Sequence, residues 1–83
     1  MGALYTSMTI SAERGRFIMD IFHRDLVAMM TGENDEYIVK MLRHGIEYYT
    51  WEANSGGKMF SNEEYRMLIE LYRAELWGRY ELV

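Results

Sequence analysis

The chain has 83 residues, with nine Lys and Arg against thirteen Asp and Glu and a formal net charge of −4. It contains no cysteine, which excludes disulfides, zinc–thiolate sites and thiol catalysis. A negative balance argues against a surface that follows nucleic-acid phosphates, so we expect no direct nucleic-acid binding.

The pattern of apolar residues predicts an all-α fold. Proline is absent and apolar residues recur at a period of about 3.6, as in amphipathic helices. A chain of this length supports one hydrophobic core, because two smaller domains would each bury too little apolar surface. We expect an N-terminal tail over residues 1–10 and one three-helix domain over 11–83, formed by an antiparallel helical hairpin and a third packed helix.

The first helix is predicted from about Ser11 to Met30, and Gly32 ends it. Asp25 falls inside its apolar face. We expect this carboxylate to turn toward an Arg or Lys of the second helix, and the alternative is a functional carboxylate. The predicted inner face consists of Ile18, Ile21, Phe22, Leu26 and Met29.

The second helix is predicted from about Asp35 to Ala53, with Asn34 as its N-terminal cap. Gly45 in mid-helix costs about 1 kcal/mol relative to alanine, and its presence predicts a close helix crossing. The helix is apolar around more than half of its circumference. One face carries Ile38, Leu42, Gly45, Ile46, Tyr49 and Ala53, and Tyr37, Met41, Tyr48 and Trp51 extend it.

The third helix is predicted from Asn62 to about Leu82, after a glycine-containing loop over residues 54–58. Ser61 and Glu64 have the spacing of a capping box, and Phe60 is placed to pack on Tyr65 as a hydrophobic staple. These features give the most specific local signal in the chain.

The third helix carries two apolar stripes, which require two neighbours. Leu68, Ile69, Tyr72 and Leu76 belong to the first, which we expect to face the core. The second predicts a homo-oligomeric seam, most simply in a dimer, because its small residues allow close helix packing. Docking of another protein or intramolecular burial are the alternatives. The second stripe contains Met67, Leu71, Ala74, Gly78 and Leu82.

Chemistry-bearing motifs are absent, so we expect no catalytic residues, no cofactor, no metal and no enzymatic activity. His23 and His44 would lie at similar heights in the hairpin, beside Asp20 and Glu47. All four fall on polar faces, whereas metal sites of helical bundles point into the core, so we interpret them as surface residues.

The leading hypothesis is a non-catalytic binding protein that regulates or inhibits a larger protein, one with a basic surface. Small size and negative charge are shared by many inhibitors of phages and mobile elements. The alternative is a small-ligand binder with a pocket lined by tyrosines and Asp25. Amphipathic aromatic residues are enriched at binding surfaces. The aromatic interface candidates are Tyr37, Tyr48, Trp51 and Trp77.

We expect a cytoplasmic protein without membrane contact. The first basic residue is Arg14, which does not fit the cationic start of a secretory signal. No segment approaches the roughly 20 apolar residues of a membrane span.

Overall fold

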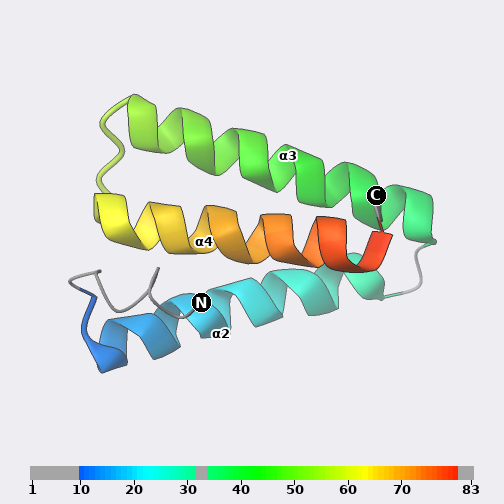
Figure 1. Ribbon diagram of the computed structural model, residues 1–83, viewed down its shortest axis with the longest axis horizontal. Helices are drawn as coiled ribbons and strands as arrows, with labels where there is room; N and C mark the ends of the chain where they lie inside the picture. Colours follow the sequence, from blue (N-terminus) through cyan, green and yellow to red (C-terminus); the bar gives the residue numbers. More distant parts are fainter. Residues whose placement is uncertain (1–9, 32–33, 81–83) are drawn as a thin grey trace.

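The computed structural model describes residues 10–31 and 34–80. It contains three α-helices, followed by a short π-helix, and no strand within those ranges. The all-α prediction is confirmed, whereas the expected tail lies almost wholly outside the described residues. The helices are α2 (Ala12–Met30), α3 (Asp35–Asn54) and α4 (Asn62–Glu75), and the π-helix is η1 (Leu76–Tyr80) (Figure 1).

Each α-helix begins where a short polar side chain accepts a hydrogen bond from a backbone N–H of the first turn. Asn34 Oδ1 accepts from the N–H of Tyr37 at 2.9 Å, and Ser61 Oγ accepts from that of Glu64 at 3.2 Å. Ser11 caps α2 in the same way. These contacts satisfy N–H groups that lack an intrahelical partner, and they confirm the predicted caps of α3 and α4.

The start of α4 is tied to the start of α2. Glu64 completes the capping box by accepting from the N–H of Ser61 at 3.0 Å, and the Phe60 and Tyr65 rings meet at 5.4 Å. Arg14 of α2 then donates twice to the same carboxylate, from Nε at 2.8 Å and from Nη2 at 3.2 Å. The bond from Arg14 holds the pKa of the buried Glu64 carboxyl below its ordinary value.

Replacing Ser61 with alanine is expected to lower the free energy of unfolding by about 1 kcal/mol, because the Glu64 N–H loses its side-chain acceptor. Urea unfolding at one fixed protein concentration measures this change. Ser55→Ala, at the C-terminal cap of α3, is the matched control, since no side-chain bond starts a helix there. An unchanged midpoint for Ser61→Ala would mean that the cap does not stabilise α4.

Helix α4 lies between α2 and α3 in Figure 1. Among the α-helices, α3 and α4 pack together most extensively, and α2 and α3 least. The two helices of the predicted hairpin, α2 and α3, therefore diverge from each other away from the loop that joins them. The predicted inner faces supply the core. Its buried residues are Ile18, Phe22, Met29, Ile38, Leu42, Phe60, Tyr65, Leu68, Tyr72 and Leu76.

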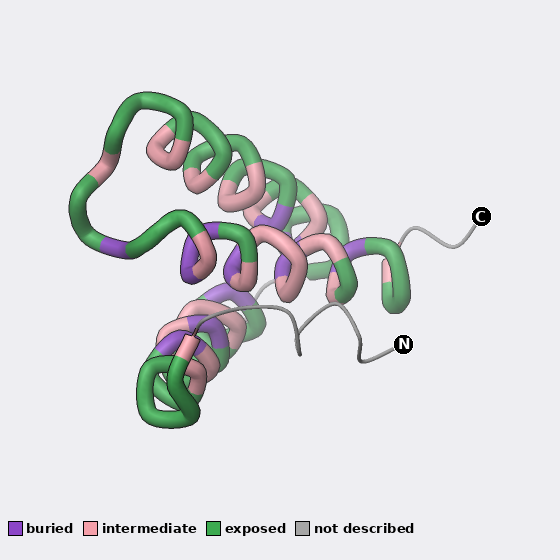
Figure 2. Tube along the Cα trace, turned by 60° about the vertical axis from the view of Figure 1, so that its left-hand side comes forward, coloured by how far each residue is buried: buried purple, intermediate pink, exposed green. Residues whose placement is uncertain are grey.

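Burial is uneven among the helices. Of the residues of α3, Ile38 and Leu42 are the buried ones, and both lie in its first half. Most of α3 is therefore intermediate or exposed in Figure 2, while α4 is buried at regular intervals. The width of the apolar arc on α3 exceeds what α2 and α4 cover.

The third helix changes its hydrogen-bond pattern after Glu75, where η1 begins. A π-helix closes wider turns than an α-helix, so positions beyond Glu75 no longer follow 100° per residue. The predicted α-helix to about Leu82 is therefore corrected: the α-helical part ends at Glu75, and residues 81–83 lie outside the described ranges.

Candidate functional site

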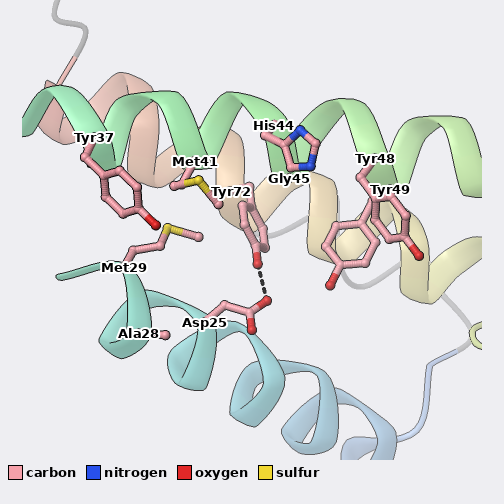
Figure 3. A pocket seen from close by; sticks show the side chains of 10 residues that line it. All are labelled: Asp25, Ala28, Met29, Tyr37, Met41, His44, Gly45, Tyr48, Tyr49 and Tyr72. Atoms are coloured by element: carbon pink, nitrogen blue, oxygen red, sulfur yellow. Dashed lines mark hydrogen bonds between the residues drawn. The ribbon is translucent and has the colours of Figure 1, made fainter. Parts of the chain in front are cut away.

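A groove of about 400 Å³ opens between α2 and α3, with α4 behind it (Figure 3). It exists because α4 separates α2 from α3, leaving facing side chains of the two helices uncovered. Ten residues line it: Asp25, Ala28 and Met29 from α2, Tyr37, Met41, His44, Gly45, Tyr48 and Tyr49 from α3, and Tyr72 from α4.

Gly45 lets the Tyr72 ring lie directly against the backbone of α3. A Cβ atom at position 45 would lie 2.6 Å from Cε2 and 2.9 Å from Cδ2 of that ring, closer than real Cβ contacts. The predicted close crossing at Gly45 is thus confirmed. The approach positions Tyr72 at the back of the groove.

Tyr72 donates its phenolic O–H to Oδ2 of Asp25, which joins α4 to α2 across the groove (Figure 3). The expected partner of Asp25, an Arg or Lys of the second helix, is wrong. Asp25 faces α4 because that helix, and not α3, lies next to this part of α2. The carboxylate remains half-buried on the groove wall.

The Tyr72, Tyr49 and Tyr48 rings of the groove form a continuous series that reaches Phe22 in the core. Tyr72 contacts Phe22 edge-on at 5.3 Å and Tyr49 at 5.6 Å, and Tyr49 contacts Tyr48 at 5.4 Å. Burial raises the pKa of Tyr72 and of Tyr49, and the negative charge of Asp25 raises both further. Both hydroxyls stay protonated at neutral pH, and that of Tyr72 is the donor to Asp25.

A regular stripe along α3, which we call the α3 stripe, borders the groove through four of its five residues. Its members follow one another at spacings of four, three, four and three residues, the repeat of a helix-packing seam. Tyr37 is 39% exposed, Tyr48 44% and Trp51 63%, so the chain itself covers these large apolar groups only in part. The α3 stripe consists of Tyr37, Met41, His44, Tyr48 and Trp51.

Three of the four aromatic interface candidates belong to this stripe, and Trp77 does not. Trp77 lies in η1, is 49% exposed, and has the Arg73 guanidinium 4.6 Å above its ring. The structure therefore separates the aromatic candidates into two places.

The second stripe of the third helix is partly buried within this chain and partly exposed. Met67 and Leu71 are partly buried against the core of this chain, whereas Ala74 and Gly78 are exposed. Leu82 lies outside the described residues. Part of the stripe is thus intramolecular, and the seam between two copies stays a prediction for its exposed part.

The histidines do not meet the carboxylates as a cluster. Among residues 10–31 and 34–80, no three His, Asp or Glu side chains are grouped so as to hold a metal ion. His23 is exposed on α2, and His44 lies at the groove. In the same part of the chain, no helix combines the length and apolar character that crossing a membrane requires.

From the sequence, a pocket lined by tyrosines and Asp25 was the alternative prediction, and the arrangement of these residues was not predicted. Tyr72 was assigned to the core and Asp25 to a basic partner, and nothing in their spacing pointed to a contact across 47 positions. Gly45 was the available signal, because a mid-helix glycine marks the position where a ring can approach. The Arg14–Glu64 pair was missed as well.

The comparisons with known proteins add no family: no family model, no curated protein and no solved structure matches the chain.

Proposed function

We propose that this chain is a non-catalytic binding protein that holds a basic amphipathic helix of a larger protein against the α3 stripe and the groove beside it. Regulation or inhibition of that larger protein would follow from occupying the segment. The observation that carries the proposal is the exposure of Tyr37, Tyr48 and Trp51 on one helix face at seam spacing.

The shape of this face supports a helical occupant. A helix-in-groove complex buries apolar side chains at spacings of three and four residues, and the α3 stripe has the matching repeat. An incoming helix would lie between α2 and α3 and complete a four-helix arrangement. Tyrosine, tryptophan and methionine are enriched in such contacts, since they bury much area and adapt their shape.

Charge supports a basic occupant. The chain carries a formal net charge of −4, and Asp25 places a carboxylate on the groove wall. Complementary charge speeds the encounter of two proteins and disfavours acidic competitors. These charges support placing the proposed basic partner at this face.

The test is affinity purification from cells of the source organism, with the chain carrying a photo-crosslinking residue at Tyr48 or at Trp77. We expect a covalent adduct with one larger protein from position 48 and none from position 77. Mass spectrometry of the adduct should place the crosslink in a basic helical segment.

Three variants complete the experiment. Trp51→Ser should lose the partner, whereas Trp77→Ser and Ala74→Arg should keep it, because they change exposed positions away from the groove. Loss of the partner with Trp77→Ser or Ala74→Arg, but not with Trp51→Ser, would contradict the proposal and assign binding to the third helix. Light scattering of the purified samples tests the homodimer: Ala74→Arg should halve the mass if the seam exists.

A further inference from the structure

We propose that the groove between α2 and α3 is a binding site for an organic ammonium group, held between the Asp25 carboxylate and the tyrosine rings of α3. This inference rests on the proposed function, because it names the chemical group that the groove would recognise. Two sources carry this chemistry: a lysine side chain of the partner helix, or a free quaternary ammonium compound.

The anion of the site is fixed in place. Asp25 Oδ2 accepts the O–H of Tyr72, whose ring is 2% exposed and held against Gly45. The carboxylate therefore has one immobilised oxygen and a half-buried position, where its field is screened less than in bulk water. Besides burial, the charge of Asp25 raises the pKa of the Tyr49 hydroxyl, on the opposite wall of the groove.

The aromatic part of the site lies along α3 and faces this anion. In Figure 3, Tyr37 and Tyr48 extend from α3 toward α2 on either side of the Tyr72–Asp25 pair, and Tyr49 lies next to Tyr48. A cation near a tyrosine ring is attracted by the negative face of its π system. Met29 of α2 and Met41 of α3 add polarizable sulfur to the lining of the groove.

Other ligand classes fit these residues less well. An anion would meet the Asp25 carboxylate in a chain whose net charge is already −4. A neutral apolar group would desolvate the carboxylate without supplying a counter-charge, which costs free energy. The space of about 400 Å³ accommodates a trimethylammonium group or the end of a lysine side chain.

The test compares choline with 3,3-dimethylbutan-1-ol, which has the same shape and no charge, in NMR titrations of the whole chain. We expect choline to shift the groove resonances saturably and the neutral alcohol to bind about tenfold more weakly. Equal binding of the two probes would overturn the cation site and leave an apolar groove only.

Variants separate the two parts of the site. Asp25→Asn keeps an acceptor for Tyr72 but removes the charge, and Tyr48→Leu removes an exposed ring, so each should weaken choline about tenfold. Tyr48→Phe keeps the ring and should bind within threefold of the parent. Asp20→Asn, with the same charge change on the exposed side of α2, is the control and should bind like the parent.

A second pair of probes distinguishes the sources. Tighter binding of N-acetyl-lysine methylamide than of choline would assign the site to a partner lysine, and the reverse order to a free quaternary ammonium. If neither probe binds while Trp51→Ser still loses the crosslinked partner, the inference fails and the proposed function stands. If choline binds but the Trp51→Ser variant still recovers the crosslinked partner, the proposed function fails instead.

Discussion

Replacing Gly45 with valine is expected to lower the free energy of unfolding by about 3 kcal/mol, the upper part of the range for overpacked cores. The new Cβ would lie 2.6 Å from Cε2 of Tyr72, so either the ring or the helix must move. The rings of Phe22 and Tyr49 hold the Tyr72 ring on two sides, with centroids 5.3 Å and 5.6 Å away, so a movement would disturb this packing. The gain in helix propensity over glycine is only about 0.3 kcal/mol and cannot compensate.

Chemical unfolding of the purified variant measures this loss. Gly78→Val is the matched control: nothing lies within 4 Å of the Cβ position there, so its stability should stay within about 0.5 kcal/mol of the parent. Equal stability of the two valine variants would show that α3 and α4 do not cross closely at Gly45. Loss of choline binding with Gly45→Val would additionally connect the crossing to the groove.

Replacing Tyr72 with phenylalanine is expected to cost about 2 kcal/mol, since hydrogen bonds to charged groups contribute more than neutral ones. The ring and its packing remain, so the loss reports on the hydroxyl and on the Asp25 carboxylate that it leaves without its donor. Tyr80→Phe, at a partly buried position in η1, is the control and should change stability by less than about 0.5 kcal/mol.

A double-mutant cycle isolates the contact itself. Tyr72→Phe, Asp25→Ala and the double variant should show a coupling energy of about 1 to 2 kcal/mol in unfolding experiments. Additive losses would mean that the two groups do not interact, and the groove would lose its fixed anion. Because stability is measured without ligand, this cycle is independent of the choline titrations.

The Gly45–Tyr72 approach and the Tyr72–Asp25 hydrogen bond together hold the groove in place. Gly45 allows the Tyr72 ring to reach the surface of α3, and the hydroxyl of that ring then holds Asp25 on α2. A single residue of the middle helix thus connects both walls of the groove. If the groove binds an ammonium group, its anion is already oriented before the ligand arrives, which reduces the entropic cost of binding.

The sequence by itself determined the helices and where they begin, because capping is local. Ser61 and Glu64 lie three residues apart, so their reciprocal bonds need no tertiary contact. The inner faces were equally predictable: the positions of Leu42 and Leu68 in a period of 3.6 place both in the core, where they are fully buried.

The tertiary structure alone decided which helix lies in the middle. A helical wheel gives the direction of a side chain but not the neighbour that it meets, so Asp25 was assigned to α3 while its partner lies on α4. The same limit applied to the wide apolar arc of α3 and to the second stripe of α4. Helix order in space depends on how whole faces fit, and here α4 packs against both α2 and α3, which leaves most of the α3 stripe exposed.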